Sequence, residues 1–597
     1  MKSSGRVFAF FAALLALPPL LAAVNNPDIF WHLSAGRRMA ETGALVRADF
    51  LSWTLAGEPW TNFEWLAQLI YHYLFSAGGW TALFLLKTAL LAACLFPLWR
   101  ILRLHGREGW APAVLPFFSL AMLPMADLRP DNFSILFFLT LLWRLEALRL
   151  SGGVPSLRQT AAGALFFAVW ANLHPGCLFG LVLAGFYAAG GVIEGRGRGW
   201  RGWAGLLAAC AAAPLVNPNG GELYRVAFLH QAEMGLLERE IAEWAAPDIT
   251  VAYQAPGIIL MGAALVAMLW SVAGRRARNS GTAATGAGGY ADGPGTDCGQ
   301  CRPDPARRRM PPAAHILALA FFVWAAASHS RNLMFSAAAA MAFMPPLLPA
   351  LTAGLRAAAA QAAAVLAAFA LAWGPARASF TAPHGSAFSS PPAGAFLRAN
   401  AGELSRLKLF NTWNWGAWLG YAAGPSGYRI FADGRYLFHP MLAEFAAART
   451  DTGAWKEMME KYAFELAVLP PGTGGELEQR ELNGRKTSFV RPNHARYFPQ
   501  EDWAVLFWDR NLAVFVRRSS LSPFRLNSME LRYLRPGELG NALELARAGL
   551  APLPVLRDEA RRLLLFQESS AASADGSVRA WLESLEKACR EPGAACR

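Results

Sequence analysis

A succession of apolar runs constrains this chain more than any other feature of its sequence. Between residues 7 and 374 the runs are about 16 to 24 residues long, and short polar segments separate them. Because a helix needs roughly 20 apolar residues to cross a bilayer, each run predicts a membrane-spanning helix. The residues after 375 contain no run of this kind, so we expect them to form a water-exposed region.

The composition excludes two other classes of protein. Only 16% of the 597 residues are charged, whereas about 25% are charged in an ordinary soluble protein. Hydrophobic residues make up 54% of the chain, which excludes an intrinsically disordered protein.

We predict eleven membrane spans, and this odd number places the termini on opposite sides of the membrane. The spans are expected near residues 7–24, 79–102, 110–126, 131–150, 158–174, 176–193, 203–217, 254–273, 312–328, 331–350 and 355–374. With a cytoplasmic N-terminus, the inner segments hold 19 Lys and Arg against 6 Asp and Glu, and the outer segments hold 7 against 13. Basic loops stay inside, so this asymmetry predicts an external C-terminal region. The net charge of +13 is therefore a topology signal, and we expect no nucleic-acid partner.

The expected fold is a polytopic α-helical membrane domain of about eleven helices, followed by a smaller external α/β domain and a helical tail. The regions are the membrane domain, 1–375; its external loops, 25–65 and 217–254; its disordered cytoplasmic loop, 274–309; a linker, 376–390; the α/β domain, 391–520; and the helical C-terminal region, 521–597. Within the α/β domain, short β-like runs predict strands at 407–412, 428–433, 464–469 and 503–517, and helical patterns predict helices at 440–449 and 453–462.

Three details of this layout allow a second interpretation. The first apolar run also resembles a secretory signal peptide, and its cleavage would leave ten spans with the same outer face. Cys298 and Cys301 have the spacing of half a zinc site, but no second Cys or His pair accompanies them. Cys589 and Cys596, if external, are able to form a disulfide.

The first outer loop begins with the polar sequence Asn-Asn-Pro-Asp-Ile-Phe-Trp-His at residues 25–32. Asp28 and His32 are four residues apart, so on a helix starting after Pro27 they lie on one face. Such a carboxylate and imidazole can hold a divalent cation such as Mg²⁺ or Mn²⁺, with Asp28 as the ligand, or deprotonate a hydroxyl. The alternative is that Asp28 caps the helix and His32 forms an interfacial hydrogen bond.

Other outer segments carry ionisable residues close to the spans. Asp49 and Glu64 are flanked by aromatic residues, with helix capping by Asp49 and Asn62 as the alternative. The outer turns and the loop 217–254 add Arg129, His174, Glu243, His329 and Arg331. Arginine suits bidentate binding of phosphate, although at a membrane rim it also extends to the headgroups. Because inner loops lack this acid, His and Arg mixture, we predict an outer site for a lipid-linked phosphate substrate.

The pattern resembles the GT-C superfamily of polytopic glycosyltransferases, which use polyprenyl-phosphate-linked sugars. In that superfamily an acidic residue early in the first external loop serves as catalytic base or metal ligand, and Asp28 holds that position. The stretch 27–65 is similar to a recurrent bacterial subgroup, which Arg129–Pro130 also fits. Residues 413–416, Trp-Asn-Trp-Gly, are similar to the W-D-Y-G acceptor motif of the oligosaccharyltransferase branch, with Asn in place of Asp.

The resemblance implies an enzyme of the bacterial inner membrane that transfers a sugar from a polyprenyl-phosphate donor to a lipid, glycan or protein acceptor at the periplasmic face. Asp28 is then the base or metal ligand, His32 assists it, and Arg129 or Arg331 neutralises the departing phosphate. The remaining candidate substrate-binding residues are Asp49, Glu64, His174, Glu243, His329, Trp413 and Trp415. A non-enzymatic flippase of lipid-linked glycans is the alternative, and an anchored scaffold is a third hypothesis.

Overall fold

The chain forms two compact units, each assembled from two stretches of sequence. The structure, a computed structural model, describes all residues except 1–15, 18, 196, 198, 226–227, 229–233, 284–311, 349–383, 386, 473, 569–576 and 591–597. Unit 1 comprises Met1–Ala23 and Thr81–Ala382, and unit 2 comprises Val24–Trp80 and Pro383–Arg597. The first outer loop therefore folds together with the C-terminal region.

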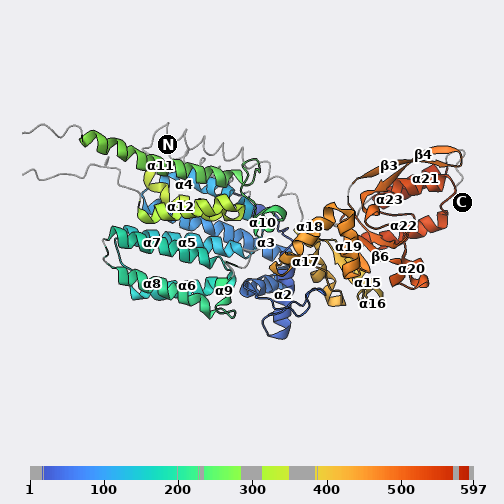
Figure 1. The fold of residues 1–597 in the computed structure, drawn as a ribbon, viewed down its shortest axis with the longest axis horizontal. Helices are drawn as coiled ribbons and strands as arrows, with labels where there is room; N and C mark the ends of the chain where they lie inside the picture. The colour runs from blue at the N-terminus through green and yellow to red at the C-terminus, as the bar shows by residue number, and fades with distance from the viewer. Residues whose placement is uncertain are drawn as a thin grey trace, which may run out of the picture. The chain divides into compact units, whose positions relative to one another are not determined.

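The described residues of unit 1 form helices and connecting turns, and the longer helices run alongside one another (Figure 1). They are the second part of α3 (Trp65–Leu104), α4 (Ala111–Ala121), α5 (Asp131–Leu150), α6 (Leu157–Leu173), α7 (Cys177–Glu194), α8 (Trp200–Ala212), α9 (Glu222–Arg225), α10 (Met234–Glu240), α11 (Ala255–Ala283), α12 (Ala313–Ser328) and α13 (Leu333–Phe343). Helices thus occupy the nine expected spans that lie in the described part of the chain. The span 355–374, most of the span 7–24, and Cys298 and Cys301 lie outside it.

Small side chains allow the helices of unit 1 to approach closely. Every residue of α13 is buried, and its sequence is a run of alanines flanked by larger apolar residues. Helix α13 packs against α12, α11 and α5. A helix that is apolar on every side is one that its neighbours surround, so α13 forms the centre of the unit.

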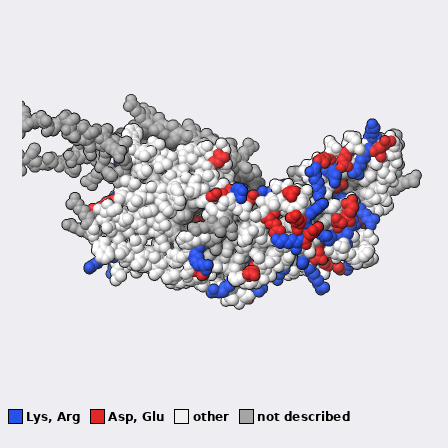
Figure 2. Space-filling model, viewed as in Figure 1, with Lys and Arg blue, Asp and Glu red and all other residues white. Residues whose placement is uncertain are grey.

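Two described helices, α3 and α7, are long and apolar enough to cross a membrane, and the shorter segments Ala255–Trp270 and Ala313–Ser328 are also apolar. Large apolar side chains such as Leu165, Val266 and Trp324 are exposed on unit 1. The face of unit 1 seen in Figure 2 carries few charged residues, whereas that of unit 2 carries many of both signs. Large exposed apolar surfaces of this kind mark membrane or partner contacts.

Helix α3 is interrupted at Gly78 and Gly79, close to the point where the chain passes from unit 2 to unit 1. Gly79 has φ 57° and ψ −144°, a conformation that essentially only glycine adopts. The amphipathic stretch before the interruption follows the first outer loop, and the apolar stretch after it matches the expected span at 79–102. A single continuous helix over Trp65–Leu104 is therefore excluded by the backbone itself.

Unit 2 combines the first outer loop with a mixed sheet and surrounding helices (Figure 1). Its elements are α2 (Ile29–Thr42), the first part of α3, α15 (Pro391–Ala399), α16 (Ala401–Leu404), β1 (Leu409–Asn411), α17 (Trp413–Ala422), α18 (Leu442–Thr450), α19 (Thr452–Tyr462), β2 (Leu466–Leu469), β3 (Gly475–Leu482), β4 (Arg485–Pro492), β5 (Trp503–Trp508), β6 (Ala513–Arg517), α20 (Pro523–Met529), α21 (Leu539–Arg547), α22 (Leu553–Gln567) and α23 (Ser577–Ala588). Cys589, after α23, is disulfide-bonded, and Cys596 lies beyond the described residues.

Four strands form the main sheet in the order β1-β2-β6-β5. Strand β1 pairs in parallel with β2, with Phe410 opposite Ala467, and β6 pairs antiparallel with β2 and β5. These strands confirm the predictions at 407–412, 464–469 and 503–517, including the turn at Asp509, whose Oδ1 accepts from the Asn511 and Leu512 amides. All residues of β5 are buried although it is an edge strand, because α15 and the segment at Leu531 pack against it.

Two features of unit 2 differ from the sequence predictions. The predicted strand at 428–433 is wrong: only Ile430 makes a bridge, and its partner is Ser52 of the first outer loop. The hairpin of β3 and β4 was not predicted, because the burial of β3 is low throughout and half of its sequence, Gly-Glu-Leu-Glu-Gln-Arg-Glu-Leu, is charged. Strand β3 has no buried face to generate an alternating apolar pattern, and the buried Phe489 lies on β4.

Candidate active site

The predicted site residues divide between the two units. Unit 2 contains Asp28, His32, Asp49, Glu64, Trp413 and Trp415, and unit 1 contains Arg129, His174, Glu243, His329 and Arg331. Each unit therefore holds its own group of candidate residues.

Asp28 lies at the start of α2, where its carboxylate does not cap the helix. Its backbone is helical, with φ −63° and ψ −25°, and its side chain makes no capping hydrogen bond. The Asn26 side-chain oxygen instead accepts a hydrogen bond from the Asp28 backbone amide at 2.8 Å. The capping alternative for Asp28 is therefore wrong, and its carboxylate is half-buried.

The Asp28 carboxylate lies beside the backbone of Gly434, in the segment between α17 and α18. A Cβ atom at Gly434 would stand 2.8 Å from Asp28 Oδ1 and 3.8 Å from Trp413 Nε1. The half-buried Trp413 indole lies parallel to the His439 ring, with ring centres 6.3 Å apart. Trp415, in contrast, is only 6% exposed and packs edge-to-face against Trp418, so its ring contributes to the interior of unit 2.

His32 is buried and faces an acidic partner from the next element. Its Nδ1 lies 3.8 Å from Glu64 Oε2, and its ring packs against Trp31 with ring centres 3.6 Å apart. Glu64 immediately precedes α3 and remains partly exposed. This arrangement places a carboxylate where it can orient the imidazole or stabilise its protonated form.

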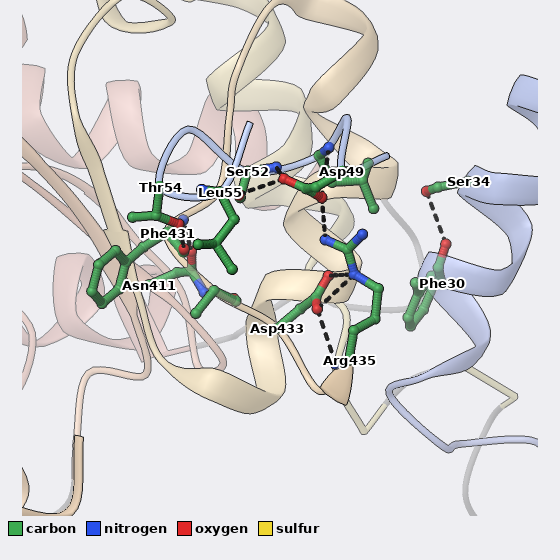
Figure 3. Close-up of polar contacts among 12 residues, drawn as sticks. Phe30, Ser34, Asp49, Ser52, Thr54, Leu55, Asn411, Phe431, Asp433 and Arg435 are labelled. Atoms are coloured by element: carbon green, nitrogen blue, oxygen red, sulfur yellow. Dashed lines mark hydrogen bonds and ion pairs between the residues drawn. The ribbon is translucent and has the colours of Figure 1, made fainter. Parts of the chain in front are cut away.

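Asp49 is buried in a polar turn and does not cap a helix, which corrects the capping alternative (Figure 3). Its carboxylate accepts from the Ser52 amide at 3.0 Å and from the Ser52 hydroxyl at 2.5 Å. It also pairs with Arg435, whose Nη2 lies 2.7 Å from Asp49 Oδ1. The Asn62 side-chain amide exchanges two 2.7 Å hydrogen bonds with Gln68 on α3.

Arg435 joins Asp49 to Asp433 in a buried ion network that sequence reasoning missed (Figure 3). Its Nε lies 2.9 Å from both carboxylate oxygens of Asp433, and its guanidinium stacks over the Trp60 ring at 4.8 Å. Burial alone lowers the pKa of Arg435, but the two carboxylates outweigh it and raise the pKa above its usual value. An Asp-Gly-Arg sequence inside the apolar stretch 428–438 was the available signal.

In unit 1, three outer segments meet at Glu243. One carboxylate oxygen forms an ion pair with Arg129, which precedes α5. The other lies 3.9 Å from Nη1 of Arg331, between α12 and α13. Burial raises the pKa of Glu243, but the two guanidinium charges outweigh it and hold the pKa below its usual value. Glu243 is therefore ionised at neutral pH and shared by two arginines.

Both predicted histidines of unit 1 lie in the same region. His329 Nδ1 lies 2.8 Å from the carbonyl oxygen of Trp244, and the Arg331 guanidinium lies over the Trp244 ring at 4.6 Å. His174 Nδ1 lies 2.8 Å from the Ser134 hydroxyl near the start of α5. Four outer segments that are far apart in the sequence thus supply one cluster of positive and negative groups.

Asp131, at the first position of α5, belongs to this cluster and was missed. Its side chain is 9% exposed, and among the described residues its Oδ1 has no hydrogen-bond partner. Its charge interacts with those of Arg129, Arg331 and Glu243. The sequence Arg-Pro-Asp-Asn at 129–132 was the signal, since it places a second ionisable residue two positions after Arg129.

Metal-ligand geometry is absent from the described residues: no three His, Cys, Asp or Glu side chains are placed to hold a metal ion. Asp28 and the His32–Glu64 pair do not form such a group. The divalent cation expected at Asp28 therefore has no set of three ligands in the described part of the chain.

Comparisons with known proteins find similarity in structure alone. No protein-family model and no curated protein sequence matches the chain. The oligosaccharyltransferase AglB from Archaeoglobus fulgidus, in complex with an inhibitory peptide and a dolichol-phosphate, matches over 95% of this chain and 86% of its own, with 11% identity and a TM-score of 0.54.

A second structure of the A. fulgidus oligosaccharyltransferase, tethered to an acceptor peptide with the NVT sequon, gives 11% identity, the same coverage of both chains and a TM-score of 0.51. ArnT from Cupriavidus metallidurans, bound to undecaprenyl phosphate, covers 88% of this chain and all of its own at 14% identity, but its TM-score of 0.42 is too low to support an inference. The chain therefore shares the fold of the A. fulgidus oligosaccharyltransferase.

Proposed function

We propose that this protein is a membrane glycosyltransferase that transfers a sugar from a polyprenyl-phosphate donor to an acceptor hydroxyl at the outer face of the bacterial inner membrane. Unit 1 would span the membrane, with a cytoplasmic N-terminus, and the C-terminal region would be periplasmic. The fold supports this proposal, since the A. fulgidus enzyme was captured with a dolichol-phosphate.

The observation that carries the proposal is the Arg129–Glu243–Arg331 cluster. Two guanidinium groups that share a single carboxylate retain a surplus of positive charge, which suits a phosphate. During transfer, the bond between the anomeric carbon and the phosphate oxygen breaks, and its electron pair stays on the phosphate. Arg129 and Arg331 would neutralise that charge, while Glu243 holds the two guanidinium groups close together.

Asp28 would accept the proton of the acceptor hydroxyl as that oxygen bonds to the anomeric carbon. His32, whose ring faces Glu64, would assist Asp28 by holding the polar side chains near the start of α2 in place. Trp413 would provide an aromatic face for a sugar ring. The acceptor peptide of the A. fulgidus structure is not carried over, because Asn414 stands where the related acceptor motif has Asp.

The test is sugar transfer by the purified full-length protein from radiolabelled undecaprenyl-phosphate hexoses, with bacterial envelope extract as the acceptor source. Asp28→Asn should lower kcat about a hundredfold, because a general base typically contributes 10²- to 10⁴-fold. Arg331→Ala should lower kcat/KM about tenfold or more, because a charge-assisted hydrogen bond is lost. Addition of EDTA tests the need for Mg²⁺ or Mn²⁺.

Matched controls are Glu58→Gln, an exposed acid of the same loop, and Arg225→Ala, an exposed arginine of the outer loop 217–254. Both should retain wild-type rates. Full activity of Asp28→Asn would contradict the proposal. Relocation of the donor across vesicles without its consumption would favour the flippase alternative.

A further inference from the structure

The segment Asp433–Gly434–Arg435 passes directly beside the Asp28 carboxylate. A Cβ added to Gly434 would come within 2.8 Å of Asp28 Oδ1, closer than real Cβ contacts allow. The backbone of Gly434 does not have a positive φ, so the requirement for glycine here is one of space. Any larger residue would displace the Asp28 carboxylate or the segment itself.

This segment cannot move easily, because both neighbours of Gly434 are held in the interior of unit 2. Asp433 is fully buried and Arg435 is 2% exposed. Asp433 Oδ1 accepts from the Arg435 amide at 3.0 Å, and the Arg435 side chain bridges Asp433 and Asp49 (Figure 3). Breaking a buried ion pair by removing one partner is strongly unfavourable, so the network opposes displacement of the segment.

The segment is also tied to the first outer loop and to the main sheet. Asp49 belongs to the loop between α2 and α3. In the same loop, Ser52 forms a β-bridge with Ile430, which lies just before the segment. On the other side, the carbonyl of Ala432 accepts from the Asn411 side-chain amide at 2.8 Å, at the end of β1. The backbone at Gly434 is thus fixed from the outer loop and from the sheet at once.

We propose that Gly434 is a positioning residue, which acts with the Asp49–Arg435–Asp433 network to set the place of the Asp28 carboxylate relative to the acceptor. This proposal rests on the proposed function of Asp28. According to this proposal, the Gly434 backbone of the C-terminal region is the rigid surface against which the Asp28 carboxylate lies. This surface is rigid because it consists of backbone, and the buried charges of Asp433, Arg435 and Asp49 determine its position.

The test compares Gly434→Ala with wild type in the transfer assay with undecaprenyl-phosphate hexoses. We expect kcat to fall about tenfold or more while KM for the donor is unchanged, because only the carboxylate moves. In the Asp28→Asn background, Gly434→Ala should lower the residual rate no further. Gly540→Ala, where a Cβ meets nothing within 4 Å, is the matched control and should retain the wild-type rate.

The outcomes separate the two proposals. If Asp28→Asn is fully active, the proposed function fails. If Asp28→Asn is inactive and Gly434→Ala is folded and fully active, or lowers the residual rate of Asp28→Asn further, the positioning role is overturned. If thermal unfolding shows that Gly434→Ala does not fold, Arg435→Lys replaces it, and an unchanged kcat in that variant overturns the proposal as well.

Discussion

At the scale of single residues, two charged side chains each pair with two groups of opposite charge. Arg435 contacts two carboxylates, and Glu243 contacts two guanidinium groups. Each is therefore part of a group whose net charge depends on all its members. Such groups respond to the loss of one member more strongly than an exposed ion pair does.

His494 gives unit 2 a defined pH dependence. Burial is the main cause that lowers the pKa of His494 to about 4, and the charge of Arg535 adds to it. Its Nδ1 donates to the Pro471 carbonyl at 3.1 Å, while among the described residues Nε2 has no acceptor for a second proton. The unfolded chain binds this proton near pH 6.5 and the folded chain does not, so stability is complete above pH 6.5 and falls toward pH 4.

We expect this histidine to remove roughly 3 kcal/mol of unfolding free energy between pH 6.5 and pH 4. The measurement is hydrogen–deuterium exchange of β6 in the full-length protein, corrected for intrinsic rates, since His494 packs against Phe515 of that strand. His494→Gln should show a smaller loss of protection over this range. An identical pH dependence in both proteins would contradict the role of His494.

At the scale of helices and strands, Glu146 joins four segments of unit 1. Its carboxylate is fully buried and lies 2.8 Å from the ring nitrogens of His105, after α3, and His315, on α12. The hydroxyl of Tyr187, on α7, donates to it at 2.9 Å, and Arg149 pairs with it from the next turn of α5. This cluster fixes the mutual position of four segments that apolar packing alone would allow to slide.

Glu146→Gln keeps the shape of the side chain but removes the charge that its partners share. We expect a loss of about 3 to 5 kcal/mol, because one partner of a buried network is removed. The melting temperature of the purified full-length protein measures it. Glu222→Gln, in an exposed pair with Arg225, should change stability by less than about 1 kcal/mol. Equal melting temperatures for the two variants would contradict this prediction.

At the scale of the whole molecule, the distribution of charge predicts the orientation in the membrane. The inner segments carry the basic surplus, and unit 2 carries charges of both signs on the face seen in Figure 2. Glu108, in an inner segment, and Glu481, in the β3–β4 hairpin, are both exposed. They therefore provide two probes for opposite sides of the membrane.

With a membrane-impermeant maleimide on spheroplasts, Glu481→Cys should react in intact cells, beyond the signal of the parent protein. Glu108→Cys should react only after the membrane is permeabilised. Reaction of Glu108→Cys in intact cells would reverse the predicted topology. In that case, the Arg129–Glu243–Arg331 cluster would lie on the cytoplasmic side.

The sequence by itself determined where the helices and the core strands lie, because burial in a membrane or in a sheet imposes a local pattern. Apolar runs long enough to span predicted the positions of helices such as α5 and α7, and the apolar run at 503–517, split by polar residues at 509–511, predicted β5 and β6. Local composition also grouped Arg129, Glu243 and Arg331, since each lies in a segment that the charge pattern predicts to be outer.

Only the tertiary structure decided which of these residues meet. Nothing local to Asp49 indicates that Arg435 will be its partner, and nothing local to Trp415 indicates that its ring will be buried. The hairpin β3–β4 was missed because β3 is exposed, and the strand predicted at 428–433 is wrong because only Ile430 there pairs, with the distant Ser52. The physical reason is that apolar burial is written into the sequence period, whereas ion pairs and close backbone approaches depend on where separate segments come together.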